Sequence, residues 1–184
     1  MCVTSALIIR GTDSLGVNAP MERKGDTGKI PIFVAATGKV EMVDPIRKTD
    51  EEWRRILPPF SFEVARGHGT EQAFTGRYHD FHGDGMYRCI CCGTDLFLSR
   101  AKFDSGTGWP SFSAAIAHEN VALRTDRSYG IVRTEVLCAR CDAHLGHVFD
   151  DGPPPSGKRY CMNSASLRFV ARGDLAKKDP GSPG

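Results

Sequence analysis

One cysteine near the C-terminal end stands between two polar residues, in the stretch GKRYCMNSAS. In an extended segment the side chains alternate between two faces, so Arg159, Cys161 and Asn163 would share one face. A cysteine that is only buried needs neither a guanidinium nor a carboxamide beside it. A nucleophilic cysteine reacts as the thiolate, which a neighbouring positive charge stabilises. The pattern therefore indicates a site that holds a thiolate and a polar substrate.

Four other cysteines form two Cys-x-x-Cys pairs, in the stretches YRCICCG and VLCARCD. The pairs are Cys89 with Cys92 and Cys138 with Cys141, and each follows a strand-like segment. Two such turns can direct four thiolates at one point, which is the ligand set of a closed, structural zinc site. The apparent binding energy of such a site is about 10–16 kcal/mol. Four unligated thiols and an iron ion in the same geometry are the alternatives.

The remaining cysteines argue against a disulfide framework. An odd total of seven, with two Cys-x-x-Cys pairs, favours metal binding in a reducing compartment. Gly93 follows Cys92 directly and suits the turn of the first pair, because glycine adopts backbone conformations that other residues avoid. We therefore assign Cys91 to no metal, and Cys2 is also left over.

The elements that must position these residues are short and mostly β-like. Thr49 and Glu52 form a capping box at the start of the stretch TDEEWRRIL, whose apolar residues predict one short helix ended by the pair Pro58-Pro59. Beyond it, β-like runs are separated by glycine and proline, with no helical period. The fold class predicted is mainly β and antiparallel, with a helix packed at its start. The runs are the alternation at Phe62 and Val64, the stretch MYRCI after the turn Asp84-Gly85, and residues 121–124, 129–137, 145–149, 158–162 and 167–170.

The length of 184 residues suits one domain. Residues 1–48 show no sustained period, so we expect a disordered extension there. The domain proper is predicted at 49–172, and a flexible tail at 173–184.

The composition excludes several classes of protein. The formal net charge is only +2, and the 24 basic residues are scattered, which argues against a nucleic-acid or membrane-surface protein. No apolar run approaches the length of a membrane span, and the N-terminal residues lack the pattern of a signal peptide. We expect a cytoplasmic monomer.

Three further segments, KFDSGTGWPSF, HLGHVFDDGP and RYCMNSASLRF, complete a recognisable set with the two Cys-x-x-Cys pairs. From about Trp53 to Phe169 the chain closely resembles methionine-R-sulfoxide reductases of the MsrB type, enzymes that restore one epimer of oxidised methionine. The resemblance implies a fold of two antiparallel sheets, the β-tent shared with Mss4-like proteins, with a structural zinc ion away from the active site. It also implies that the enzyme reduces the R epimer in proteins or peptides.

The resemblance also implies the roles of individual residues. Cys161 would be the nucleophile, and Trp109 would form a wall of the pocket for the methyl group of the substrate. Considered alone, the two histidines of the HLGH stretch could be structural, Trp109 could belong to the core and Arg159 could be a solvated charge. The further implied positions are His144, His147, Asn163, Asp151 and Arg159 around the nucleophile, and Phe149 at the substrate.

The chemistry of these residue types agrees with the resemblance. A free cysteine has a pKa of about 8.5, and lowering it by two units takes roughly 2.7 kcal/mol. Arg159 and a protonated His144 or His147 carry the right charge to lower it. A protonated histidine can also donate a proton to the departing oxygen. The products would be methionine and a sulfenic acid on Cys161.

The chain departs from the family pattern at Thr107, where many members carry the cysteine that resolves the sulfenic acid. A hydroxyl cannot form a disulfide, so we predict a one-cysteine enzyme. Thioredoxin or another small thiol would then reduce Cys161 directly. An alternative to this cycle is that Cys2 or Cys91 acts as the resolving thiol. The alternative is a zinc-ribbon-like binding module without catalysis, which would rest on the two Cys-x-x-Cys pairs alone.

Overall fold

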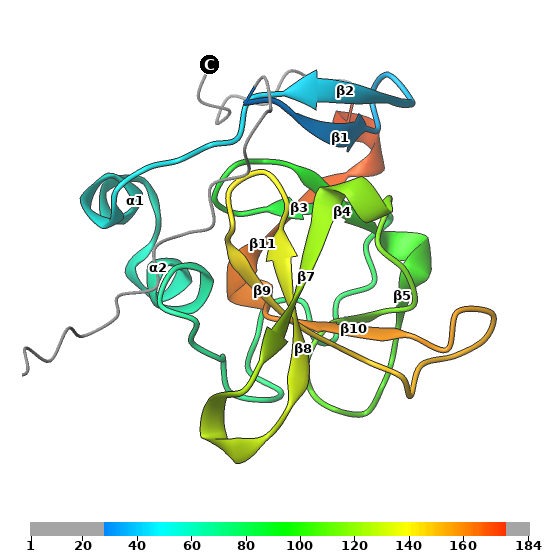
Figure 1. Cartoon of the computed structure of the whole chain (residues 1–184). Coiled ribbons are helices and arrows are strands. Elements are labelled where there is room, and N and C mark those ends of the chain that lie inside the picture. The colour runs from blue at the N-terminus through cyan, green and yellow to red at the C-terminus, as the bar shows by residue number, and fades with distance from the viewer. Residues whose placement is uncertain (1–27, 176–184) are drawn as a thin grey trace, which may run out of the picture.

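The computed structural model describes residues 28–175, and within this range the protein is mainly β, as predicted (Figure 1). The strands form three antiparallel sheets, in the orders β1-β2, β5-β6-β10-β9-β8-β7 and β11-β3-β4. The helices are α1 (Asp50–Ile56) and α2 (Pro59–Ala65). The strands are β1 (Ile30–Val34), β2 (Lys39–Val43), β3 (Gly85–Cys89), β4 (Asp95–Leu98), β5 (Lys102–Phe103), β6 (Ser111–Phe112), β7 (Val121–Asp126), β8 (Arg133–Cys138), β9 (His144–Phe149), β10 (Arg159–Met162) and β11 (Leu167–Ala171).

The β1–β2 hairpin occupies a segment that we expected to be disordered. The expectation was wrong for residues 30–43, and residues 1–27 lie outside the described range. Ile32 is buried, and the backbone of Phe33 forms two hydrogen bonds of 2.8 Å with the side chain of Asn120. The backbone N–H of Ala35 also donates to Asp95, at 2.9 Å. The hairpin is therefore held by polar side chains that lie 60 or more positions away in the sequence.

The helical region contains the predicted helix and a second one, α2, where we wrongly expected a β-like run at Phe62 and Val64. Thr49 and Glu52 form the expected capping box at the start of α1, and Trp53 is buried. Ile56, expected on the apolar face, is 54% exposed. We read the pair Pro58-Pro59 as a stop signal only, but Pro59 is also the first residue of α2. Proline suits that position, because the first N–H of a helix has no intrahelical partner.

The six-stranded sheet carries one polar face. Paired residues on neighbouring antiparallel strands direct their side chains to the same side. The register therefore creates a row across five strands, each residue directly opposite the next: Ser111, Cys161, His147, Glu135 and Arg124.

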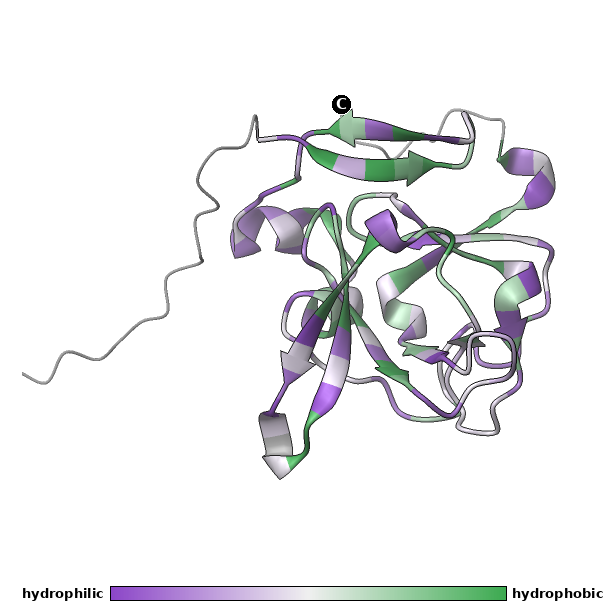
Figure 2. Cartoon of the chain, turned by 45° about the vertical axis from the view of Figure 1, so that its right-hand side comes forward, coloured by the Kyte–Doolittle hydropathy of each residue, from purple (hydrophilic) through white to green (hydrophobic). Residues whose placement is uncertain are grey.

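The opposite face of this sheet packs into the core. Val136, Met162 and Phe112 on it are fully buried, and the Phe112 ring packs against Tyr87 and Phe97 of the three-stranded sheet. Figure 2 shows hydrophobic and hydrophilic residues alternating along the long strands of this region. Within residues 28–175, no helix has the length and apolar character that crossing a bilayer requires.

The predicted C-terminal tail lies only partly within the described range. Arg172–Asp174 form a short 3-10 turn where we expected the flexible tail to begin. The rest of that tail, from residue 176, lies outside the described range.

Candidate active site and metal centre

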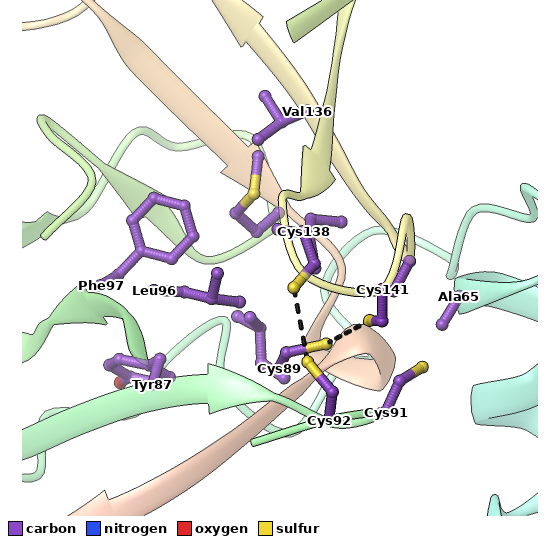
Figure 3. Packing of buried hydrophobic residues seen from close by; sticks show 14 of the residues in the cluster. Ala65, Tyr87, Cys89, Cys91, Cys92, Leu96, Phe97, Val136, Cys138 and Cys141 are labelled. Atoms are coloured by element: carbon purple, nitrogen blue, oxygen red, sulfur yellow. Dashed lines mark hydrogen bonds between the residues drawn. The ribbon is translucent and has the colours of Figure 1, made fainter. Parts of the chain in front are cut away.

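The four cysteines of the two Cys-x-x-Cys pairs meet at one buried point (Figure 3). The sulfur atoms of Cys89 and Cys141 are 3.7 Å apart, and those of Cys92 and Cys138 are 3.5 Å apart. A tetrahedral zinc ion with bonds of about 2.3 Å would place its sulfur ligands about 3.8 Å from one another. The four side chains therefore fit one metal ion, as the spacing predicted.

The two turns that carry these cysteines have the same backbone hydrogen bonds. The N–H of Gly93 donates to Cys89 O, and the N–H of Asp142 donates to Cys138 O, both at 2.9 Å. Gly93 has a φ of 76°, which explains the glycine after Cys92, and Asp142 has a φ of 56° at the equivalent position. Two matching turns thus present two sulfur atoms each.

Cys91 lies beside this cluster, and its side chain is 5% exposed. Figure 3 shows it next to Cys92, on the side of the cluster that faces α2. The guanidinium of Arg66, just after α2, donates to the carbonyl of Cys141 at 2.8 Å and lies over the Trp53 ring. The helices are thereby fastened to the metal centre.

Cys161 lies on the polar face of the six-stranded sheet and is partly buried. Its sulfur is 4.0 Å from the hydroxyl of Thr107, the residue at the usual position of a resolving cysteine. Ser111 lies directly opposite it on β6, and His147 directly opposite it on β9. Within residues 28–175, no hydrogen bond joins Cys161 to His144, His147 or Asn163.

Burial raises the pKa of the Cys161 thiol above its ordinary value. The charge of Arg159 acts in the opposite direction, as expected from the sequence, and hydrogen bonds with Thr107 and Ser111 assist it. These effects do not outweigh burial. Burial therefore affects the pKa of Cys161 more than the neighbours that we expected to lower it.

Arg159 is held on the same face as Cys161 by two partners. Its guanidinium forms a paired contact with Asp151, at 2.9 and 2.8 Å, and lies 4.5 Å from the centre of the Phe149 ring. Asp150, the neighbouring carboxylate, pairs with Lys158 instead. Three positions implied by the resemblance, Arg159, Asp151 and Phe149, are thus in mutual contact.

His147 is oriented by an aspartate that the sequence analysis missed. Its Nε2 is 2.9 Å from Asp126 Oδ2, which also accepts from Arg133 at 2.7 Å. The other oxygen of Asp126 accepts from the backbone N–H of Ser128. That hydrogen bond, together with those from the Ser128 hydroxyl, His147 and Arg133, holds the pKa of Asp126 well below its ordinary value. The imidazole of His147 therefore faces a permanent carboxylate.

His144 is almost fully buried and belongs to a different network. Its Nδ1 is 2.7 Å from Glu135 Oε1, which is equally far from Nδ1 of His68, while Arg124 donates to Oε2. Burial lowers the pKa of His144 and outweighs the neighbouring carboxylate, so the neutral ring is favoured. His144 is therefore poorly suited to supply the positive charge that we expected from it.

Glu71 joins Asn163 and Trp109, which are distant in sequence. The backbone N–H of Glu71 donates to the Asn163 side chain at 3.0 Å, and the indole N–H of Trp109 donates to the carbonyl of Glu71 at 2.9 Å. The buried carboxylate of Glu71 accepts from the N–H groups of Ser164 and Ala165, at 2.7 and 2.9 Å. Nothing in the sequence around Glu71 indicated this role.

Trp109 itself is partly buried and lines a small cavity of about 220 Å³. Phe74 and Gly108 lie on the same wall, and the N–H of Phe74 donates to Gly108 O. A side chain at position 108 would collide with the Phe74 backbone, so the glycine before the tryptophan is required. The rest of its wall is largely polar, with His79, His82 and Lys102 among the lining residues, and Cys161 is not one of them.

Residues 57–171 match the SelR domain family. A peptide methionine sulfoxide reductase MsrB of Herminiimonas arsenicoxydans is 58% identical over 134 residues, which are 73% of this chain and 98% of that protein. The protein of the same name from Thiobacillus denitrificans is 61% identical over 122 residues, 66% of this chain and 92% of its own. The chain belongs to this MsrB family. It is an oxidoreductase of the MsrB type, as the resemblance implied.

Membership of the MsrB family accounts for the polar face and for the cysteine cluster together. Sequence reasoning found the residues that stand in recognisable motifs. It missed Glu71, Asp126, Glu135 and Ser111, which reach the site through strand pairing or from loops without a pattern.

Proposed function

We propose that this MsrB-type enzyme reduces the R epimer of methionine sulfoxide in proteins or peptides, with Cys161 as the nucleophile. The observation that carries the proposal is the placement of Cys161. It lies partly buried on a polar face, beside Arg159 and directly opposite His147. The names of the relatives supply the reaction class, and the family resemblance supplies the choice of epimer.

The first step follows from the state of the thiol. Cys161 holds its proton until substrate is bound, because burial raises its pKa. Its sulfur then attacks the sulfur of the substrate while a proton passes to the sulfoxide oxygen. The S–O bond to the substrate breaks, methionine leaves, and the oxygen stays on Cys161 as a sulfenic acid. The substrate sulfur gains two electrons, and the cysteine sulfur loses them.

Arg159 and His147 have separate roles in this step. The guanidinium of Arg159 stabilises the thiolate as it forms, because its charge favours the ionised sulfur. Asp126 binds Nε2 of His147, which leaves Nδ1 for transfer of the proton to oxygen. Phe149 and Trp109 would contact the methyl sulfoxide group.

The second half of the cycle is proposed to use an external thiol. Thr107 stands 4.0 Å from the Cys161 sulfur and cannot form a disulfide. Cys91 is buried at the metal centre, and Cys2 lies outside the described residues. Thioredoxin or a similar small thiol attacks the sulfenic acid and releases water, and a second thiol then frees Cys161.

We also propose that the metal is zinc and that it has a structural role. Four thiolates leave no ligand position open for chemistry, and the metal centre ties both turns and the helices together. Cys-x-x-Cys pairs that bind metal and a cycle that uses an external thiol suit a reducing compartment, and we propose a cytoplasmic protein, taken to be a monomer.

A single-turnover experiment tests the one-cysteine cycle. Reduced, zinc-loaded enzyme is mixed with excess R-epimer peptide without reductant, and the methionine formed is measured per chain. We expect one methionine per chain, and a sulfenic acid on Cys161 that dimedone traps, with the other six cysteines still reduced. A stoichiometric disulfide from Cys161 to Cys91 or Cys2 in non-reducing peptide maps would contradict it.

A further inference from the structure

A cavity of about 720 Å³ adjoins the polar face, beside the outer, loop-side half of the β7–β8 hairpin. This hairpin projects from the body of the protein (Figures 1 and 2). The cavity is larger than the one beside Trp109, and its size is typical of ligand pockets. His147 lies on its wall, so the cavity begins one strand away from Cys161. We call it the hairpin cavity.

Three arginines and two carboxylates line the hairpin cavity. Each carboxylate already has an arginine partner. Arg124 donates to Glu135 at 3.0 and 2.8 Å, and Arg133 donates to Asp126 at 2.7 Å. These two pairs leave no net charge.

Arg127, the third arginine, has neither an ion pair nor a side-chain hydrogen bond within the described part of the chain. It is exposed and begins the loop that joins β7 to β8. Glu135 and Asp126 are poor partners for Arg127, because their oxygens already contact imidazole nitrogens as well as the other two arginines. The cavity therefore has one surplus positive charge, and Thr70 and Ser128 add polar groups to its wall.

We propose that the hairpin cavity binds a carboxylate side chain of the substrate, a few residues from the oxidised methionine. The inference rests on the proposed function. An extended peptide advances about 3.3 Å per residue, and neighbouring strands are about 4.8 Å apart. Arg124 lies three strand spacings from Cys161 in the same row, about 14 Å, and Arg127 lies three residues further along, about 10 Å, which places it about 17 Å from Cys161. With the lengths of the two side chains included, an acidic residue about three to five positions from the methionine reaches Arg127. The enzyme would then prefer methionines in acidic segments of proteins.

The test compares three peptides that differ only at positions three to five from a central R-epimer methionine sulfoxide. These positions carry serine, glutamate or lysine, and methionine formation is measured with dithiothreitol at low ionic strength. For the wild type we expect KM to be about two- to fivefold lower for the glutamate peptide than for the serine peptide, the range of an exposed ion pair. The KM for the lysine peptide should be higher than that for the serine peptide. Adding salt to 0.5 M should remove the ranking, because screening shortens the range of the interaction.

Arg127→Glu should reverse the order of the KM values for the glutamate and lysine peptides, and Arg127→Gln should make these KM values nearly equal. The matched control is Arg100→Glu, which makes the same charge change at an exposed residue in a different cavity, and it should keep the wild-type ranking. Equal KM values for the glutamate and lysine peptides with the wild type would overturn the proposal, as would an Arg127→Glu variant that keeps the wild-type ranking.

Turnover of the serine peptide reports the proposed function separately. The cavity has an independent readout in the binding of the same peptides to the Cys161→Ser variant by calorimetry, which requires no chemistry. A preference for the glutamate peptide there supports the cavity assignment whatever the turnover is. Equal affinities for the glutamate and lysine peptides refute it.

Discussion

Substituting Glu71 with alanine should weaken both the fold and the site, because this buried side chain receives two backbone N–H groups. A hydrogen bond to a charged acceptor contributes about 1.5–3 kcal/mol, so the two bonds account for about 3–6 kcal/mol. Removing the carboxylate also removes the cost of burying it, and we therefore expect a loss near the lower end, about 3 kcal/mol. For a protein of this size, 1 kcal/mol shifts Tm by about 2–4 °C. Glu71→Ala should thus unfold about 6–12 °C earlier than the wild type.

The activity of Glu71→Ala should fall as well. Asn163 and Trp109 bind the backbone of Glu71, and without the carboxylate this segment is no longer fastened beside β10. Misplacement of a positioning group by about 1 Å can cost 100-fold in rate, and we expect kcat/KM to fall at least about tenfold. Glu71→Gln keeps one acceptor and should lie between alanine and the wild type in both measurements.

Thermal unfolding of the zinc-loaded protein, followed by circular dichroism, gives the stability, and assays well below the transition give the activity. Glu63→Ala is the matched control. It removes an exposed carboxylate from α2 and should change stability by no more than about 0.5 kcal/mol. The account of Glu71 is wrong if both alanine variants unfold within 1–2 °C of the wild type, or if Glu71→Ala retains full kcat/KM.

Three other predictions concern the metal, the thiol and the missing resolving cysteine. Cys138→Ser should lose zinc and the native fold, because about 10–16 kcal/mol of binding energy equals or exceeds the usual stability of a domain. Cys91→Ala should keep one zinc per chain by elemental analysis. Equal metal contents in the two variants would contradict the ligand assignment. Arg159→Met should raise the pKa of Cys161 further, so that alkylation of this residue begins at a higher pH than in the wild type. Peptide-resolved alkylation from pH 7 to 11 measures this shift. A shift to lower pH would refute the role of the guanidinium. Thr107→Cys should form a disulfide with Cys161 after one turnover without reductant, because the two side chains are already 4.0 Å apart. If non-reducing peptide maps lack this disulfide, the two side chains do not come into contact.

The metal centre was predictable from the sequence because its geometry is local. Each Cys-x-x-Cys pair forms its own turn, and Gly93 marked the residue with a positive φ. The shared face of Arg159 and Cys161 was predictable for the same reason, since alternation along one strand is a local property.

The elements that depend on distant partners were missed. The β1–β2 hairpin is ordered through Asn120 and Asp95, and no pattern within residues 30–43 names those partners. Glu71 binds residues more than 90 positions away. In α2 the error was different, because proline can end one helix and begin the next, and we considered only the first possibility.

The direction of the pKa shift of Cys161 could not be predicted from the sequence either. The neighbours that lower the pKa could be named in advance, but the extent of burial that outweighs them depends on how the β6, β9 and β10 strands pack. The direction of this pKa shift is thus set by the fold and not by the motif.

The most direct test of the central claim is a single-epimer reduction assay. Each pure epimer of a blocked methionine sulfoxide is supplied with dithiothreitol to the zinc-loaded wild type and to Cys161→Ser. The account predicts turnover of the R epimer alone, and none by the variant. Turnover of the S epimer, or activity that survives in Cys161→Ser, would contradict it.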